Sequence, residues 1–205
     1  MKFFSPDSKF AQVMTSFGEM MILNICYIIG CLPLVTIGAA NVAMYTVLGR
    51  RLRDGDRSIL IPFFKAWWRN LIPGSLFWLA QALISCSLAS ILFLPMPGFL
   101  KVIAVIFLLL VTVLYSIIYP QIARFRNRWF PYLRNAVILT VTKLRWVLLN
   151  LLLILVAPAL FLISPGEFLQ YGFIWLICGF SGVFFISAEL MQKVLQPLED
   201  LSAKV

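Results

Sequence analysis

The chain has 205 residues, of which 62% are hydrophobic and only 12% are charged, and its mean hydropathy is +0.97. Soluble domains carry about 25% charged residues, so this composition excludes an ordinary soluble domain and is typical of a membrane protein. The 17 basic residues outnumber the 8 acidic ones, which gives a net charge of +9. Because no linker or low-complexity segment divides the chain, we predict a single membrane domain over residues 1–205.

Residues 17–49 form the first apolar run, which is interrupted around Pro33. Proline removes a helical hydrogen bond and clashes with the preceding turn, so the sequence predicts two helical pieces joined by a bend. We expect a first span or half-span near Glu19 to Leu32 and a shorter helix from Ile37 to about Leu52. The run is longer than one span but shorter than two. Whether it crosses the membrane once or folds back as a hairpin, and hence the side of the N-terminus, stays open.

Basic side chains concentrate in two segments, 50–69 and 124–145. Twelve of the 17 basic residues lie there, beside apolar runs. Basic clusters can bind nucleic acid, but this placement favours cytoplasmic loops governed by the positive-inside rule and by anionic lipid. We therefore predict that both segments are cytoplasmic and contact membrane lipids, and that the protein binds no nucleic acid.

The first basic segment includes IPFFKAWWRN, whose spacing predicts an amphipathic surface helix. On a helix, Phe64, Trp67 and Trp68 share one face, whereas Lys65 and Arg69 share another. Such a helix lies on the membrane surface with its tryptophans at the depth of the lipid headgroups.

Four further apolar runs complete the predicted fold. The fold class is all-α: a polytopic transmembrane helix bundle with about five spans, the first broken at Pro33, together with cytoplasmic amphipathic helices. Turns rich in Pro and Gly, at 95–98 and 164–167, are expected outside the cell, and a polar tail from Lys193 inside it. The four later spans are 71–94, 102–123, 146–163 and 168–190.

Polar side chains inside apolar runs are costly unless they are paired, so they are the natural functional candidates. Glu19 and Glu189 fall near the cytoplasmic ends of their helices, where Arg51, Arg124 or Arg126 could pair with them; ion pairing is favoured over a proton relay. Asn24, Gln81 and Asn150 could join helices by hydrogen bonds, and this role is favoured over a substrate site. The apolar runs also contain the amides Asn41 and Gln170.

The break at Pro33 is a second kind of candidate, because unwound backbone inside a membrane can leave carbonyl and amide groups free to bind a ligand. A bend that serves packing alone is the more frequent case. The candidate functional or interaction residues are Glu19, Asn24, Pro33, Thr36, Gly38, Asn41, Phe64, Trp67, Trp68 and Glu189.

Side chains for catalysis are scarce. The chain has no histidine, and its four cysteines have no paired spacing for a metal. Asp54 and Asp56 flank Gly55 among arginines, which favours ion pairing and a turn over a cation site. No phosphate-binding glycine motif occurs. We therefore predict no enzymatic activity, no catalytic residues, no metal site and no cofactor.

The N-terminal part resembles the YesL family of bacterial integral membrane proteins, whose biochemical function is unknown. The resemblance is carried by Asn24, the segment Cys31–Ala39 (CLPLVTIGA), Tyr45, the basic turn and Phe63-Phe64. It covers nearly the whole chain and is most specific over residues 19–64.

Members of this family are often encoded beside carbohydrate importers of the ATP-binding-cassette (ABC) type. The resemblance implies a multi-pass protein of the bacterial cytoplasmic membrane and an accessory role in oligosaccharide uptake, with subunits of an ABC-type sugar importer as partners. The broken span supports an alternative, a small oligomeric transporter or channel for a sugar or an ion.

Overall fold

The computed structural model describes residues 9–125, 129–163, 166 and 172–202. Within these ranges the chain forms helices with short connections and no strand, which confirms the predicted all-α class. Arg126, Gln170 and most of the predicted turn at 164–167 lie outside the described residues.

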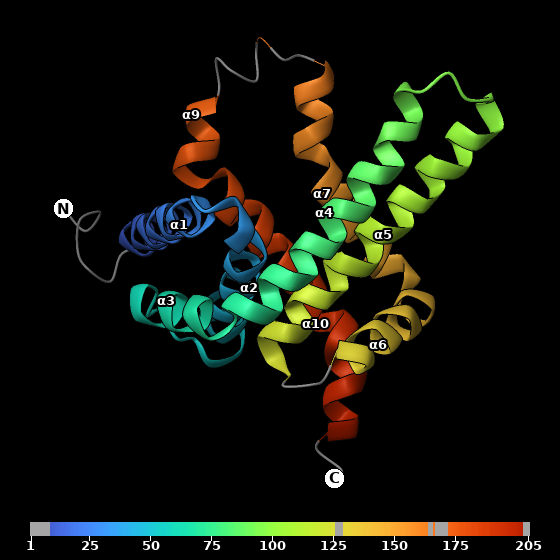
Figure 1. Ribbon diagram of the computed structural model, residues 1–205. Helices are drawn as coiled ribbons and strands as arrows, with labels where there is room; N and C mark the ends of the chain where they lie inside the picture. Colours follow the sequence, from blue (N-terminus) through green and yellow to red (C-terminus); the bar gives the residue numbers. More distant parts are fainter. Residues whose placement is uncertain (1–8, 126–128, 164–165, 167–171, 203–205) are drawn as a thin grey trace.

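The described helices pack around a common centre, from which a long hairpin of two helices projects (Figure 1). The hairpin consists of α4 and α5, with its tip at the upper right of the figure. In chain order the elements are α1 (Lys9–Cys31), the 3-10 turn η1 (Leu34–Thr36), α2 (Ile37–Asp54), α3 (Leu60–Arg69), α4 (Leu71–Phe93), α5 (Gly98–Arg124), α6 (Trp129–Thr142), α7 (Leu144–Ile163), α9 (Gly172–Ile174), the π-helical turn η2 (Trp175–Gly179) and α10 (Phe180–Ser202).

The predicted interruption at Pro33 is confirmed. α1 ends at Cys31 and α2 begins at Ile37, with Pro33 in extended backbone (φ −77°, ψ 109°) before η1. α2 ends at Asp54 and is capped by Gly55, whose φ of +66° lets its N–H donate to the carbonyl of Arg51 at 3.2 Å. A residue with a side chain rarely adopts this conformation, so glycine stops the helix here.

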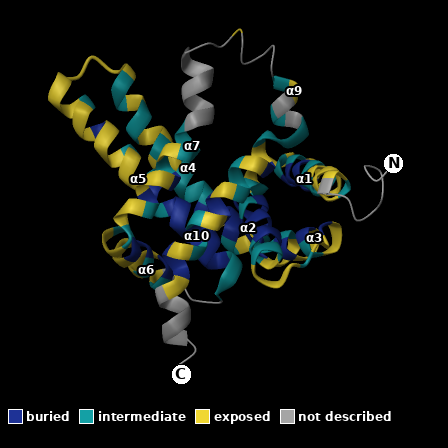
Figure 2. Ribbon diagram, turned by 180° about the vertical axis from the view of Figure 1, so that it is seen from behind, coloured by how far each residue is buried: buried dark blue, intermediate teal, exposed yellow. Residues whose placement is uncertain are grey.

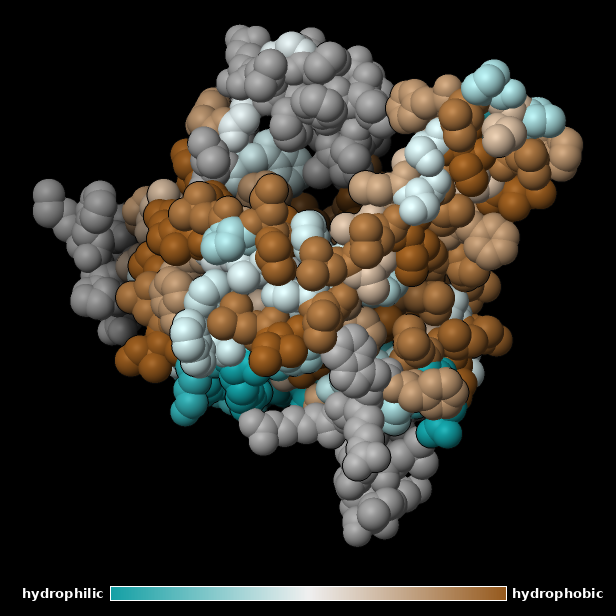
Figure 3. All heavy atoms as spheres, in the orientation of Figure 1, coloured by the Kyte–Doolittle hydropathy of each residue, from teal (hydrophilic) through white to brown (hydrophobic). Residues whose placement is uncertain are grey.

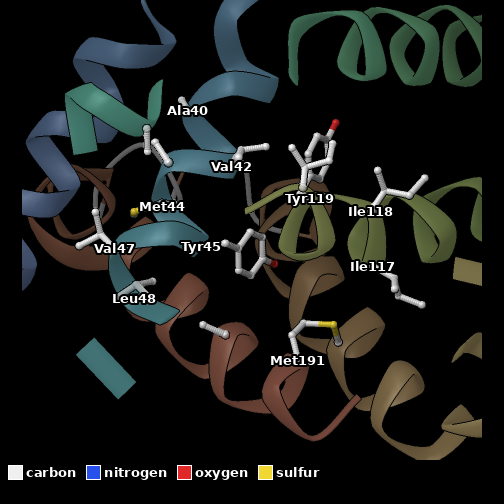
Figure 4. Close-up of a cluster of buried hydrophobic side chains, with 14 of the residues drawn as sticks. Ala40, Val42, Met44, Tyr45, Val47, Leu48, Ile117, Ile118, Tyr119 and Met191 are labelled. Atoms are coloured by element: carbon white, nitrogen blue, oxygen red, sulfur yellow. The ribbon is translucent and has the colours of Figure 1, made fainter. Parts of the chain in front are cut away.

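α2 lies at the centre of the bundle and contacts α1, α3, α4, α5 and α10. Its apolar residues are almost all buried, and Figure 2 shows the buried part of the molecule concentrated around α2 and α10. Figure 4 shows Tyr45 of α2 between Tyr119 of α5 and Met191 of α10. The fully buried residues of α2 are Ala39, Ala40, Val42, Ala43, Met44 and Leu48.

Two glycines allow α2 and α4 to cross closely. A Cβ atom added at Gly38 would lie 2.0 Å from the carbonyl oxygen of Gly74 and 2.6 Å from the Cβ of Trp78. A Cβ atom added at Gly74 would lie 2.8 Å from the backbone of Ala39. Small residues at such crossings let the two backbones approach, as in other membrane helix pairs. Gly38, a candidate functional residue, therefore serves packing.

Four described helices are long and apolar enough to cross a membrane, and a fifth span arises if one bent pair is counted as a single span. α2 is not among them, since its last turns hold Arg50, Arg51 and Arg53. The bent pair joins 130–142 of α6 to 144–155 of α7 at 104°. These apolar helices fit a multi-pass integral membrane protein. The four helices that are each long and apolar enough to cross a membrane are Phe10–Cys31, Leu71–Phe93, Gly98–Arg124 and Ile177–Gln196.

The last predicted span, 168–190, overlaps a described apolar helical segment, Ile177–Gln196, while residues 168–171 lie outside the described residues. α10 continues to Ser202, so the polar tail predicted from Lys193 is helical at first. The helix continues because Met191, Val194 and Leu195 are buried and extend its apolar face into the core.

Apolar side chains cover much of the outer surface. Phe93 and Phe99, near the tip of the α4–α5 hairpin, are 91% and 65% exposed. Figure 3 shows an apolar surface over most of the described residues, with hydrophilic residues gathered at its lower edge. Large exposed apolar patches are rare on soluble monomers, and here they fit contact with lipid.

Candidate functional site

The backbone at the Pro33 break is hydrogen-bonded within the chain. The hydroxyl of Thr36 lies 2.8 Å from the carbonyl oxygens of both Gly30 and Pro33, and the indole N–H of Trp67 donates to Gly30 at 3.2 Å. The N–H of Thr36 also donates to Pro33. Thr36 and Trp67 thus satisfy the carbonyls of Gly30 and Pro33 at the break. This favours the interpretation of the break as a bend over that of a ligand site.

Glu19 forms two ion pairs. Its carboxylate lies 2.8 Å from Arg51 and 3.3 Å from Arg57, and its side chain is only 14% exposed. The pairing with Arg51 was predicted, whereas Arg57 comes from the loop after α2. Both pairs tie α1 to the basic end of the bundle, which supports a structural role for Glu19.

Asn24 joins α1 to the π-helical turn η2. Its amide N–H donates to the carbonyl of Trp175, and its amide oxygen accepts from the backbone N–H of Ser181, both at 3.0 Å. A π-helical turn disturbs the regular ladder of helical hydrogen bonds, so these two backbone groups need other partners. Asn24 is fully buried and supplies both. This confirms the predicted interhelical hydrogen bonding.

The aromatic residues of α3 face in different directions. Phe63 is fully buried against the bundle and Trp67 is partly buried, while Phe64 and Trp68 are 39% and 72% exposed. Exposure therefore differs among the three residues predicted to share one face, although the ring centroids of Trp67 and Trp68 lie only 6.2 Å apart. Trp67 packs against the core, whereas Phe64 and Trp68 are exposed, which fits the membrane interface.

The acidic loop residue Asp56 acts as predicted, in a turn and an ion pair. Its carboxylate pairs with Arg50 and accepts from the hydroxyl and the backbone N–H of Ser58. Hydrogen bonds from Ser58, together with the charge of Arg50, lower the pKa of Asp56. Among the described residues, no group of three His, Cys, Asp or Glu side chains is placed to hold a metal ion.

A cavity of about 290 Å³ lies between α1, α2, α4, α5, α7, η2 and α10, and we call it the central cavity. Its volume is near the lower limit of ligand pockets, about 300 Å³, and corresponds to about ten water molecules. Among the described residues that line it, none carries a formal charge and seven are aromatic. They are Tyr27, Asn41, Tyr45, Trp78, Gln81, Thr112, Ser116, Tyr119, Ile154, Trp175, Phe180, Val183, Phe184 and Ser187.

Five of these aromatic rings form one continuous wall. Consecutive ring centroids lie 5.2–5.7 Å apart, in tilted or edge-to-face arrangements, within the range favoured by aromatic pairs. The wall joins α1, α2 and the segment that begins with η2. Its members, in spatial order, are Trp175, Phe180, Tyr27, Phe184 and Tyr45.

The three tyrosine hydroxyls of the central cavity are oriented by hydrogen bonds. Tyr27 donates to the amide oxygen of Asn41 at 2.8 Å, and Tyr119 donates to that of Gln81 at 2.7 Å. The Tyr45 hydroxyl lies 2.6 Å from Ser187.

Ser187 fixes the direction of the last of these bonds. Its hydroxyl donates to the amide oxygen of Asn150 at 2.6 Å, so Tyr45 is the donor to Ser187. With the tyrosine protons used in this way, the hydroxyl oxygens can still accept hydrogen bonds from a ligand.

A second cavity, of about 430 Å³, lies at the basic end of the bundle, and we call it the basic cavity. Glu189 is exposed and lines it. The remaining lining residues are Arg53, Arg124, Gln192, Lys193 and Gln196. Of the ten candidate residues from the sequence, the structure therefore places Asn41 in the central cavity and Glu189 in the basic cavity.

Sequence reasoning missed the tyrosines. Tyr27, Tyr45 and Tyr119 are polar groups inside apolar runs, as are the amides that were singled out. A tyrosine counts as apolar in composition, although its hydroxyl needs a partner when it is buried. A count of hydroxyl groups within the apolar runs would have marked all three.

Residues 20–90 match a family model described as "Protein of unknown function, DUF624". The match covers about a third of the chain and overlaps the region 19–64 that carries the resemblance noted above. Neither the curated proteins nor the solved structures give a match. The matched region includes α2, the Gly38–Gly74 crossing and four of the residues that line the central cavity on α2 and α4.

Proposed function

We propose that this membrane protein binds a small neutral saccharide in the central cavity and acts as a non-enzymatic accessory subunit in carbohydrate uptake. The observation that carries the proposal is the chemistry of the cavity, which is lined both by an aromatic wall and by neutral amide and hydroxyl groups. A sugar ring has apolar C–H faces that stack on aromatic rings, and hydroxyls at its edge that exchange hydrogen bonds with amides and tyrosines.

The absence of charge in the lining favours a neutral ligand over an ion. An ion would lose its hydration on entering this cavity, and no described lining residue offers an opposite charge. Aromatic rings can also bind organic cations. Tyr45, however, also lines a small cavity that includes Arg53 and Arg124, and the field of these arginines repels cations.

Gln81 is the residue best placed to recognise a hydroxyl group. Its amide oxygen accepts from Tyr119 at 2.7 Å, and its amide nitrogen carries two N–H donors. It lines the central cavity from α4, whereas the aromatic wall comes from α1, α2, η2 and α10. A sugar hydroxyl oxygen could accept a hydrogen bond from this amide, which would give both the amide N–H and the hydroxyl oxygen a partner.

Tryptophan fluorescence tests the binding, since Trp78 and Trp175 line the cavity. The purified full chain in detergent is titrated with neutral mono- and disaccharides and, separately, with choline. We expect saturable quenching by a sugar and none by choline. Gln81→Leu and Tyr119→Phe should weaken binding about three- to tenfold, since each removes about one hydrogen bond.

Tyr115→Phe is the matched control. Tyr115 lies one turn before Tyr119 on α5, and it does not line the central cavity. Its loss of a hydroxyl should leave sugar binding unchanged. Quenching by choline in place of sugars, or no quenching by any sugar, would refute the proposed ligand class.

The accessory role and the partners follow from the family resemblance, and they need their own test. We propose that the protein lies in the bacterial cytoplasmic membrane as a YesL-like protein and associates with subunits of an ABC-type sugar importer. A pull-down in mild detergent, from cells grown on complex glycans, should recover importer subunits. Failure to recover any of them would remove the accessory role and leave the sugar site to be judged by its own titration.

An independent transporter is the second candidate, and one observation favours it. A small cavity of about 40 Å³ shares Tyr45 with the central cavity and shares Arg53, Arg124 and Gln192 with the basic cavity. The three cavities therefore follow one another from the centre of the bundle to its basic end. Uptake of a labelled sugar by liposomes that contain only this protein, as a monomer or an oligomer, would support this candidate over the accessory role.

A further inference from the structure

The basic cavity brings together cationic side chains from three helices that are far apart in the sequence. Arg53 lies in the last turn of α2, Arg124 is the last residue of α5, and Lys193 lies in α10. We propose that this cavity binds a phosphate group, either as a free phosphate or as the headgroup of an anionic phospholipid. The site is separate from the sugar site proposed above.

The charge balance of the cavity favours an anion. Its lining contains three basic side chains and one carboxylate, that of Glu189. Asp54 also acts on Arg124 electrostatically, yet the cations still outnumber the carboxylates. Arg53 and Arg124 are close enough to repel each other. A phosphate between them would replace this repulsion with charge-assisted hydrogen bonds.

Two further features prepare the cavity for a ligand rich in hydrogen-bond acceptors. The amide nitrogen of Gln192 is buried and has no hydrogen-bond partner among the described residues. It is a neutral donor in a cavity that also holds three cationic side chains. The ammonium of Lys193 lies 4.4 Å from the ring centroid of Trp146, which limits its movement at the edge of the cavity.

The position of the cavity matches that of a headgroup site. It is formed where helices end at the basic end of the bundle, and basic pockets between transmembrane helices at this level bind lipid phosphates in other proteins. Guanidinium groups match phosphate geometry with two parallel hydrogen bonds, which an ammonium cannot do. Arg53 and Arg124 are therefore expected to contribute most of the affinity.

Thermal unfolding of the full chain in lipid nanodiscs tests the proposal. In nanodiscs of phosphatidylcholine, inorganic phosphate is titrated at constant ionic strength against chloride. In a second arm, phosphatidylglycerol replaces part of the phosphatidylcholine and no phosphate is added. A saturable rise of the unfolding temperature in the first arm identifies a free phosphate, and a rise confined to the second arm identifies a lipid headgroup.

Charge-neutral variants connect the response to this cavity. Arg53→Gln and Lys193→Gln should each weaken the response, with an affinity loss of about tenfold for Arg53→Gln. Arg53→Lys should restore part of it. Arg69→Gln is the matched control, because Arg69 is an exposed arginine on α3 outside the cavity and its loss changes the net charge equally.

Two results would overturn the proposal. One is the lack of a saturable response in both arms. The other is an equal reduction by Arg69→Gln and Arg53→Gln, since that would reflect the net charge of the protein and not a defined site. Because none of the variants touches the central cavity, sugar quenching measured in parallel separates a failure of this site from a failure of the sugar site.

Discussion

Asn24 shows how one buried side chain joins two segments 151 residues apart in the sequence. Its amide supplies both a donor and an acceptor to the backbone around the π-helical turn, where the regular helical ladder is interrupted. Glu19, five residues earlier on α1, joins the same helix to Arg51 and Arg57. Single polar residues in α1 thus fix its position against both the aromatic wall and the basic end.

Removal of the Asn24 amide is predicted to destabilise the protein. Asn24→Ala removes the buried hydrogen bonds to the Trp175 carbonyl and from the Ser181 N–H, at a cost of about 1–3 kcal/mol. Unfolding by sodium dodecyl sulfate in mixed micelles measures the change. Thr142→Val is the control, because the exposed hydroxyl of Thr142 bonds only to its own helix, at Ile138. Equal stability of the Asn24→Ala variant and the natural chain would contradict the bridging role.

Asp56 is predicted to make stability depend on pH in the acidic range. Its pKa in the folded protein is lowered below the ordinary value of an aspartate by the Ser58 hydrogen bonds and by Arg50. A lowered folded-state pKa means that its stabilising contribution is present above the unfolded pKa and disappears as the pH falls through the folded pKa. Thermal unfolding between pH 6 and pH 3, about the range of this transition, should show a smaller acid-induced loss for Asp56→Asn. An unchanged pH profile in this variant would contradict the prediction.

At the scale of elements, the crossing of α2 and α4 depends on two glycines. Gly38 and Gly74 touch backbone to backbone, and this places Asn41 of α2 and Gln81 of α4 in the lining of one cavity. The close contact of α2 and α4 at Gly38 and Gly74 therefore helps to set the shape of the central cavity. A wider crossing would move the two amides apart and change the shape of the central cavity.

Gly38→Ala is predicted to destabilise the protein by about 1–3 kcal/mol through overpacking. The added methyl group meets the Gly74 carbonyl, which cannot move without shifting α4. Gly18→Ala is the control, since nothing lies within 4 Å of a Cβ atom added at Gly18 and alanine favours the helix. Unfolding in mixed micelles measures both variants. A Gly38→Ala variant as stable as Gly18→Ala would mean that the crossing is looser than described.

At the scale of the whole molecule, the basic segments meet at one end of the bundle. Arg53 after the first apolar run, Arg124 after α5 and Lys193 in α10 line one cavity, although long apolar helices separate them in the sequence. This arrangement agrees with the prediction that the two basic segments and the C-terminal part lie on one side of the membrane. The positive-inside rule makes that side cytoplasmic, which stays a prediction.

Cysteine labelling tests the predicted orientation. In a variant whose four native cysteines are replaced, Arg57→Cys and Arg134→Cys should resist an impermeant thiol reagent in intact cells, and Gly98→Cys at the hairpin tip should react. Permeabilised cells serve as the control, where all three should react. Labelling of the two basic positions in intact cells would mean that the orientation is the reverse of the predicted one. Labelling of only one of the two would place the basic segments on opposite sides.

The sequence by itself determined the helical class, the presence of several helices long and apolar enough to cross a membrane, and the break at Pro33, because these follow from local hydropathy and from proline geometry. It also determined the ion pairing of Glu19 and the role of Asn24 in joining helices, since a buried charge or amide in an apolar run requires a partner.

Only the tertiary structure decided which polar groups meet. Tyr27, Tyr45 and Tyr119 converge on the central cavity from three helices, and the Thr36 hydroxyl and the Trp67 indole close the break that the sequence left open as a binding site. Helices in a membrane are apolar on all sides, so hydropathy does not reveal which face of each is turned inward. That choice depends on close packing, here at Gly38 and Gly74, and the central cavity is a result of it.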